Sequence, residues 1–332
     1  MTSNSKRPRM TVYLSALLAT GVAQDLYAHA GFKQPLMEGV AGSKYVSSDN
    51  AVTITHGCNS NKGGEANGQP HRDVIALSVL FPDFTDTSKV IIRQSAGTVP
   101  PQSGNAKTTP TGTGTQGDEF VMPDLSHDIV NATNTLALPA SLTLDLGGDQ
   151  LFANTIPIVD AKGNVRGWQG WSGPRPVRGP VLLESFKKPD GTEVSTTGFS
   201  PFRLSNTIQF QPTSCAKKLQ IRVAVANWCL KGKSSYHRPD RADIWIGSMT
   251  SKFNDPELMP NASVENGGSG AIFWPTLTIN RDLAKNPVPS SCTSSDYDTV
   301  YIEPKPEDID TYLPISSARY PKGAGEKYWP TP

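Results

Sequence analysis

Short stretches in which apolar and polar residues alternate are the feature that most limits how this chain can fold. Gly, Pro, Asp and Asn bound these stretches, and the chain holds 29 glycines and 28 prolines among its 332 residues. We expect strands at Lys44–Ser47, Val52–His56, Val74–Leu80, Val90–Arg93, Ala140–Leu146, Val181–Phe186, Ile208–Phe210, Leu219–Asn227, Ala242–Ile246 and Ala271–Ile279. Because no helical pattern of roughly 10–15 residues separates them, the sequence predicts an all-β antiparallel sandwich with long loops.

The charge balance bears on the class of partner. Lys and Arg number 31, Asp and Glu number 30, and the formal net charge is +1. The longest basic run is the Lys-Arg-Pro-Arg stretch that ends at Arg9. Proteins that bind nucleic acid concentrate Lys and Arg on one face. We therefore expect no nucleic-acid partner.

The first residues have the pattern of an export signal. Lys6, Arg7 and Arg9 precede an apolar stretch, Met10–Ala23, that is too short to span a bilayer comfortably. We expect residues 1–28 to be removed by cleavage before His29, with a competing cleavage position before Gln24. The mature protein is then secreted, in the periplasm or outside the cell, and does not span a membrane.

The mature chain divides by composition into three parts. Residues 29–292 carry the predicted strands and form the predicted β-sandwich domain. Within it, residues 95–117 are rich in Ser, Gly, Thr and Pro, which predicts a polar surface insertion. Residues 293–332 show no periodicity, so we expect an irregular C-terminal tail.

Four cysteines in an exported chain predict two disulfides. The stretch 217–228 has the pattern of a single strand, which places Cys215 and Cys229 tens of ångströms apart at about 3.3 Å per residue. Cys58 therefore pairs with Cys215 or with Cys229, and Cys292 pairs with the other. A metal site built from these cysteines is disfavoured because the sequence has no C-x-x-C spacing.

A mature N-terminal histidine offers two metal ligands from one residue. The α-amine and the imidazole Nδ1 of His29 can close on one ion as a chelate, and nitrogen ligands of this kind suit Cu(II). The second protein ligand has two main candidates. His56 ends a predicted strand on its apolar face, and Glu38 lies nine residues after His29.

Weaker candidates lie in the glycine-rich stretch that follows. His71 could reach the same metal ion, and Glu65 could accept a hydrogen bond from a ligating imidazole. We expect Trp168 and Trp171 to lie at a Gly-rich turn, where they are either buried or part of a sugar-stacking surface.

Several short motifs resemble the YcnI-like copper-binding domain of exported bacterial proteins. The similarity covers roughly residues 29–95 and 160–250. The motifs are His29-Ala30-Gly31, Glu38-Gly39-Val40-Ala41-Gly42-Ser43, Val52-x-Ile54-x-His56-Gly57-Cys58, a strand like Ile75–Leu80 followed by Pro82, Trp168-Gln169-Gly170-Trp171-Ser172-Gly173, Pro201-Phe202-Arg203 and Phe210-x-Pro212.

This resemblance implies an immunoglobulin-like β-sandwich that binds Cu(II). Its implied ligands are the amine and imidazole of His29 together with Glu38, and Trp171 or Trp168 would lie over the metal. The 95–117 insertion and the long tail are additions to the compact domain of that family. The choice between the two tryptophans stays open.

Three classes of function follow from these observations. The leading one is an exported protein that holds Cu(II) for storage, delivery or homeostasis, with a copper chaperone or a membrane copper importer as partner. The second is a copper oxygenase that resembles lytic polysaccharide monooxygenases and uses a histidine brace with His56 or His71 as a further imidazole. The third is a binding or structural sandwich that takes up no metal.

Overall fold

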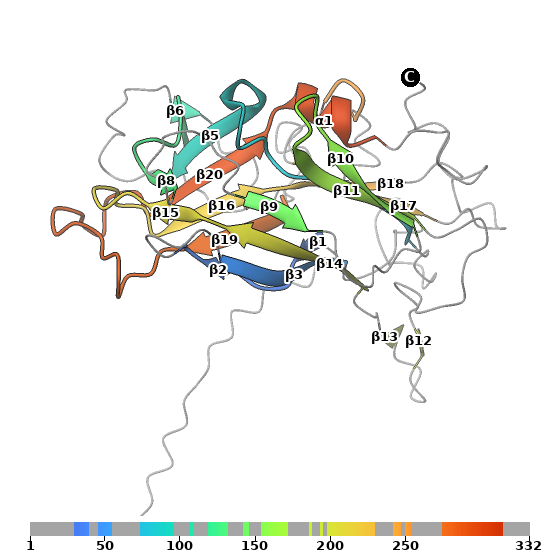
Figure 1. Cartoon of the computed structure of the whole chain (residues 1–332), viewed down its shortest axis with the longest axis horizontal. Helices are drawn as coiled ribbons and strands as arrows, with labels where there is room; N and C mark the ends of the chain where they lie inside the picture. Colours follow the sequence, from blue (N-terminus) through green and yellow to red (C-terminus); the bar gives the residue numbers. More distant parts are fainter. Residues whose placement is uncertain are drawn as a thin grey trace, which may run out of the picture.

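Strands dominate the computed structural model. It describes residues 30–39, 46–54, 74–95, 107–108, 119–131, 142–145, 154–171, 186–187, 193–194, 198–229, 242–246, 250–253 and 274–314. One α-helix, α1 (Pro306–Tyr312), occurs in these residues, beside a short 3₁₀ helix, η2 (Thr87–Lys89). The predicted all-β sandwich is confirmed (Figure 1).

One layer of the sandwich is a four-stranded antiparallel sheet in the order β1-β3-β14-β9. Its strands are β1 (Ala30–Phe32), β3 (Val46–Ile54), β14 (Gly198–Asn206) and β9 (Leu142–Asp145). β14 pairs with β3 over its full length, so these two strands form the centre of the sheet.

The facing layer is built from two sheets. A seven-stranded sheet has the order β2-β19-β16-β20-β5-β7-β6, and a five-stranded sheet has the order β10-β11-β4-β17-β18. The seven strands are β2 (Leu36–Met37), β19 (Thr276–Asn280), β16 (Lys218–Arg222), β20 (Thr299–Pro304), β5 (Val90–Ser95), β7 (Glu119–Met122) and β6 (Lys107–Thr108). The five strands are β10 (Asn154–Val159), β11 (Val165–Trp171), β4 (Val74–Leu80), β17 (Ala224–Cys229) and β18 (Ala242–Trp245). Two small sheets pair β15 (Ile208–Phe210) with β8 (Ile129–Asn131), and β12 (Phe186–Lys187) with β13 (Glu193–Val194).

Most strand pairs are antiparallel, as predicted, but two are parallel. β16 pairs with β20 and β19 pairs with β2 in parallel register. Both exceptions join segments that are far apart in the chain, so a connection much longer than a hairpin links each pair.

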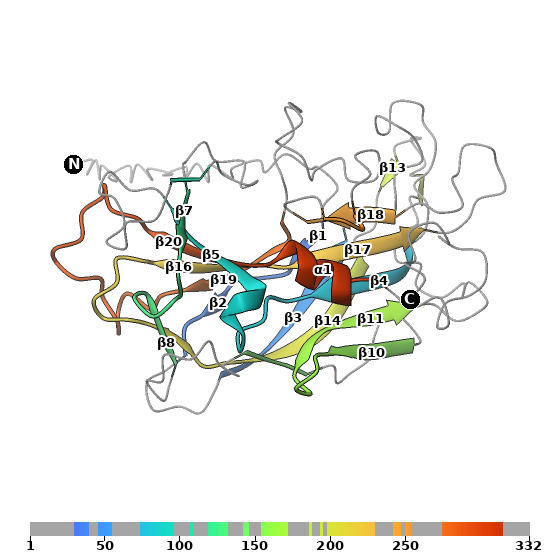
Figure 2. The ribbon, with the colours of Figure 1, turned by 90° about the horizontal axis from the view of Figure 1, so that it is seen from above.

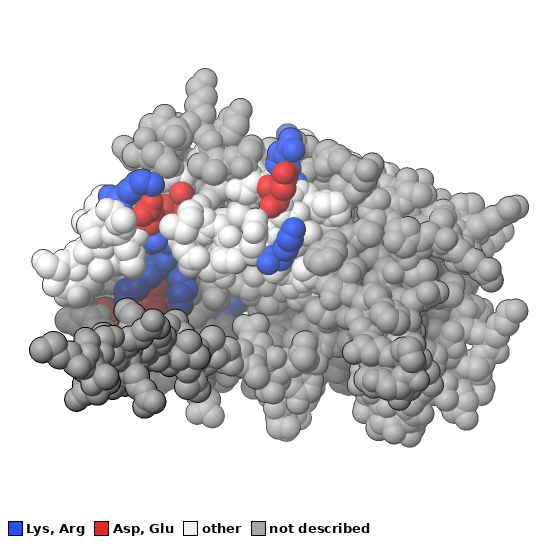
Figure 3. Space-filling view, turned by 90° about the horizontal axis from the view of Figure 1, so that it is seen from below, with Lys and Arg blue, Asp and Glu red and all other residues white. Residues whose placement is uncertain are grey.

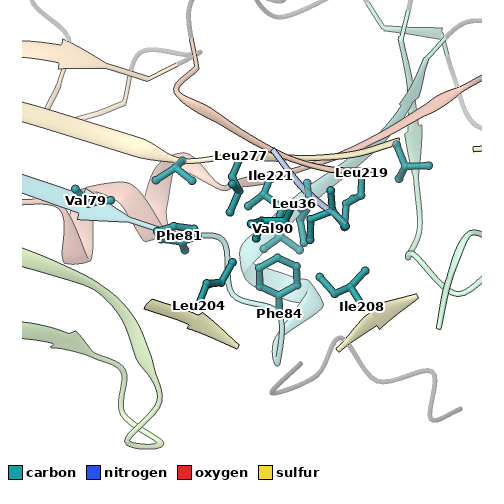
Figure 4. Packing of buried hydrophobic residues seen from close by; sticks show 14 of the residues in the cluster. Leu36, Val79, Phe81, Phe84, Val90, Leu204, Ile208, Leu219, Ile221 and Leu277 are labelled. Carbon is teal, nitrogen blue, oxygen red and sulfur yellow. The ribbon is translucent and has the colours of Figure 1, made fainter. Parts of the chain in front are cut away.

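The core fills the space between the two layers. Apolar side chains from β14, β16 and β19 meet there with side chains of the segment between β4 and β5, as Figure 4 shows for Leu204, Ile221, Leu277 and Phe81. On β16, Leu219 and Ile221 are fully buried, while the alternate positions face away from the core. The two-residue period of a strand explains this division.

The five-stranded sheet is covered on both faces. Leu77 and Val79 of β4 face the main core, whereas Ala76 and Leu80 belong to a second apolar cluster. The second cluster includes Ile309 of α1. In Figure 2 the helix α1 lies over this sheet. The C-terminal helix is therefore part of the packed structure.

Two expectations about elements are wrong. The stretch 217–228 was expected to be one strand, but it forms β16 and β17, which lie in different sheets on either side of Val223. The tail 293–332 was expected to be irregular, but it contains β20, every residue of which is buried, and α1. Of the 95–117 insertion, only Ser95, at the end of β5, and β6, which pairs with β7, lie within the described residues.

Candidate functional site

The strand pair β1–β3 bears on the two candidate histidines, His29 and His56. β1 begins at the residue after His29, and β3 ends two residues before His56. β1 pairs with β3 so that Ala30 opposes Ile54 and Phe32 opposes Val52. His29 and His56 lie outside the described residues, one position before Ala30 and two positions after Ile54. Ala30 and Ile54, the described residues nearest in sequence to the two histidines, therefore lie opposite each other at one end of β3.

The chain from β1 to β2 runs along β3 to its other end. The backbone N–H of Lys33 donates to the carbonyl of Ala51 over 3.0 Å. Further on, the Asn206 side chain donates to the carbonyl of Met37 over 2.9 Å, and Asn206 opposes Val46. The seven residue steps from Ala30 to Met37 can span at most about 25 Å, because a fully extended chain covers at most about 3.6 Å per residue.

Glu38 follows Met37 and lies at this far end. Its side chain is buried, and its Oε2 accepts hydrogen bonds from the backbone N–H of Phe210 over 2.9 Å and from the Asn286 side chain over 3.1 Å. Its Oε1 accepts from the backbone N–H of Asp282 over 2.7 Å. The carboxylate thus connects the end of β2 to the loops after β15 and β19. A role of Glu38 as metal ligand stays a prediction.

Arg281 lies next to this carboxylate and is also buried. Its guanidinium donates to the carbonyls of Ser214 and Pro287, over 2.6 Å and 3.0 Å. Burial lowers the pKa of Arg281, while the negative charge of Glu38 acts in the opposite direction. Glu38 is therefore part of a buried polar network that holds three loops together.

The two candidate tryptophans differ in how far the structure describes them. Trp168 is fully buried in an aromatic cluster, with its ring centroid 5.1 Å from Phe202 and 6.2 Å from Phe81. Its Nε1–H donates to the Ser200 hydroxyl over 3.1 Å. Trp171 is the last residue of β11, the strand that also holds Trp168, so the expectation of a Gly-rich turn at the two residues is wrong. The position of either tryptophan over a metal stays a prediction, as do the roles of His71 and Glu65, which lie outside the described residues.

The described residues contain no group of three or more His, Cys, Asp or Glu side chains that could hold a metal ion. Charged side chains of both signs lie next to one another on the face in Figure 3. Among the described residues, Arg203 and Asp49 form one exposed ion pair, with their Nε and Oδ1 atoms 2.9 Å apart. Within the described residues no helix is long and apolar enough to cross a membrane.

One predicted disulfide is present. Cys215 and Cys292 are bonded, with Cα atoms 5.6 Å apart, which agrees with one of the two pairings expected from the sequence. The bond joins the loop before β16 to the loop after β19. Cys229 ends β17, and Cys58 lies outside the described residues.

We expect Cys58 and Cys229 to form the second disulfide, because each has lost its other possible partner, and the export predicted from the sequence would bring them into oxidising conditions. Mass spectrometry of the unreduced, proteolysed protein should give a linked peptide that contains both residues, beside a Cys215–Cys292 peptide. The linked peptide should separate into two after reduction. An alkylated Cys58 or Cys229 in the unreduced, denatured protein would contradict this pairing.

Sequence reasoning missed a groove on the outer face of the seven-stranded sheet. Its cavity measures about 320 Å³. The residues that line it are Phe32, Gln34, Pro35, Lys218, Gln220, Thr276, Thr278 and Asn280. The sequence does show polar residues at alternate positions of β16 and β19. Strand prediction, however, treats such residues only as the side of the strand that faces solvent.

Comparison with known proteins gives no relative to guide the assignment. No protein-family model, curated protein or solved structure matches this chain.

Proposed function

We propose that this chain is an exported Cu(II)-binding protein that serves copper storage, delivery or homeostasis. The observation that supports the proposal is the β1–β3 register, in which Ala30 opposes Ile54. His29 directly precedes Ala30, and His56 follows Ile54 by two residues. Amine and imidazole nitrogens are ligands that favour Cu(II).

Covalent geometry limits how far apart the two histidines can be. Opposed Cα atoms in an antiparallel pair are about 5 Å apart, and each residue along the chain adds at most about 3.8 Å. The Cα atoms of His29 and His56 are therefore within roughly 16 Å of each other. Glu38 lies toward the other end of β3, and its carboxylate is engaged by three hydrogen bonds. We therefore propose His56, and not Glu38, as the partner of His29.

The bound ion would supply a redox-active centre or a cargo to be passed to a copper chaperone or a membrane copper importer. The chain's own contribution is to fix the end of β1 against β3. Because a protonated imidazole cannot ligate, copper binding should weaken as the pH falls toward the histidine pKa of about 6.5.

The same register also favours a second candidate, a copper oxygenase of the lytic polysaccharide type. Such a protein needs a second imidazole beside the N-terminal histidine, and His56 is two residues beyond the partner of Ala30. Oxidative cleavage of a polysaccharide by the copper-loaded protein with ascorbate would support the oxygenase. Tight copper uptake without such cleavage would support the carrier.

Cu(II) titration and electron paramagnetic resonance of the processed protein test the ligand set. We expect three coupled nitrogens, and we expect His56→Ala to remove one of them and to weaken Cu(II) binding about tenfold or more. Glu38→Ala should leave Cu(II) affinity unchanged but lower the free energy of unfolding by about 1–3 kcal/mol, because it leaves buried N–H donors without an acceptor.

Two results would contradict this ligand set. If Glu38→Ala weakens copper binding and His56→Ala does not, Glu38 is the ligand that the family resemblance implied. If the processed protein takes up no Cu(II), the chain is a binding or structural sandwich of another kind.

A further inference from the structure

The groove over β16 and β19 has the composition of a ligand site. Its floor is formed by alternate residues of the two strands, whose intervening residues are buried in the core. Its wall is the segment that leads from β1 to β2, including Phe32 and Gln34. Its volume of about 320 Å³ is at the lower end of the range of roughly 300–1,000 Å³ typical of small-molecule sites.

Four polar side chains in the groove are free to bind a ligand. Within the described part of the chain, no hydrogen bond or ion pair engages the side chains of Lys218, Gln220, Thr278 and Asn280. Together they offer ammonium, amide and hydroxyl donors as well as amide and hydroxyl acceptors. This mixture matches a ligand with many hydroxyl groups, because each hydroxyl both donates and accepts.

The groove is less suited to other ligand classes. Among the described residues that line it, Lys218 is the one cation, whereas phosphate-rich ligands are usually held by several cations or by a cradle of backbone N–H groups. An added peptide strand would need unpaired backbone groups, but β16 pairs with β19 and β20, and β19 pairs with β16 and β2. The face of this sheet therefore offers side chains and not a strand edge.

One aromatic ring borders the polar floor and is held in place from behind. Phe32 contacts Phe81 and Phe202 edge-on, with ring centroids 5.9 Å away in both cases. A fixed aromatic ring can pack against the C–H face of a sugar ring, while its neighbours bind the hydroxyls. The groove therefore combines an apolar stacking surface with free polar groups.

We propose that this groove binds a short oligosaccharide that carries a carboxylate, with the carboxylate at Lys218 and sugar hydroxyls at Gln220, Thr278 and Asn280. The proposal involves none of the residues suggested to bind copper, and it does not depend on copper binding. A charge-assisted hydrogen bond from Lys218 would distinguish an acidic sugar from a neutral one.

Calorimetric titration of the full-length exported protein, with a chelator present to exclude metal bridging, tests this proposal. The two probes are trigalacturonate and the same trimer with its carboxylates reduced to alcohols. We expect trigalacturonate to bind about tenfold more tightly than the reduced trimer. Lys218→Met should remove this difference, and Thr278→Val should weaken the binding of both probes about threefold to tenfold.

Lys162→Met is the matched control, because Lys162 lies in the turn between β10 and β11, where its side chain is 63% exposed. This variant should bind both probes as the unmodified protein does, and all variants should keep the same melting temperature. Failure of both trimers to bind at millimolar concentration would overturn the proposal. Unchanged binding of both trimers by Thr278→Val would also overturn it. The same holds if a mixed polar peptide binds at these residues and neither trimer does.

Discussion

Protein that retains even one residue before His29 is expected to bind Cu(II) at least about 100-fold more weakly than protein cleaved before His29. The amine and the imidazole belong to one residue, so the second metal–nitrogen bond forms at a high effective concentration. A preceding residue converts the amine into an amide, whose nitrogen has no free lone pair at neutral pH. The chelate is then lost, whichever residue supplies the next ligand.

The measurement is a competitive Cu(II) titration of three preparations: cleaved before His29, extended by one Met, and cleaved with His29→Ala. The first should bind tightly, and the other two should bind weakly. The melting temperature of the copper-free preparations should be the same, because the change lies at the chain end. Equal copper affinity of the cleaved and the extended protein would show that the amine is not a ligand.

The strands that could be predicted are those in which the pattern of apolar residues matches the burial of the two faces of the strand. The prediction of a strand at Val74–Leu80 agrees with the bounds of β4. This strand is apolar on both faces because the five-stranded sheet has a cluster on each side, with Val79 in one and Leu80 in the other. Ile208–Phe210 is likewise confirmed as β15.

Two of the strands that escaped prediction, β14 and β20, contain residues that strand patterns usually exclude. β14 contains Pro201. The described part of β9 pairs only with Arg203–Asn206 of β14, so Pro201 lies outside this paired stretch. A proline is tolerated where no ladder hydrogen bond is required from it. β20 contains Glu303, a buried charge that breaks the apolar pattern.

The buried charge of Glu303 is compensated by residues from two other strands. Glu303 accepts from Arg93 of β5 over 2.9 Å and from Arg222 of β16 over 2.6 Å. The Arg222 guanidinium also lies 4.1 Å from the centre of the Tyr301 ring. Sequence alone cannot show that three charged residues so far apart in the chain meet, so the segment resembled an exposed tail.

The candidate site, like the fold, could be predicted from the sequence only in part. A chelating role for a processed N-terminal histidine follows from the chemistry of one residue, and His56 followed from its strand parity. The surroundings of Glu38 could not be predicted, because Phe210 of β15 and the loop residues Asp282 and Asn286, which donate to it, are more than 170 residues away along the chain. Only the sheet topology shows that β2 carries Glu38 to the far end of β3.

A buried ion cluster fastens the C-terminal helix to the five-stranded sheet, and it predicts the largest effect on stability. Arg166 of β11 donates to Asp83 over 3.0 Å and also to Asp308 of α1, and all three side chains are buried. The Arg166 guanidinium also lies 5.5 Å from the ring centre of Tyr312. Burial raises the pKa of Asp308, while the hydrogen bond from Arg166 acts in the opposite direction.

We expect Arg166→Met to lower the free energy of unfolding at pH 7 by about 3–5 kcal/mol, because two buried carboxylates lose the cation between them. The loss should be smaller near pH 4.5. Asp308 has a raised pKa in the folded protein, and without Arg166 this pKa rises further. The folded state then binds more protons than the unfolded state above the ordinary aspartate pKa, so stability falls as the pH rises. Urea unfolding at the two pH values measures both effects.

Arg203→Met is the matched control, since Arg203 also pairs with an aspartate, Asp49 at 2.9 Å, but its side chain is 53% exposed. Its loss should cost no more than about 1 kcal/mol and should depend little on pH. Adding Asp308→Asn to Arg166→Met should recover part of the lost stability, because it removes the charge of Asp308, whereas Asp83 keeps Lys89 at 3.8 Å. If Arg166→Met and Arg203→Met destabilise the protein equally, the contacts of Arg166 do not hold α1 on the sheet, and the apolar contacts of Ile309 and Leu313 must do so alone.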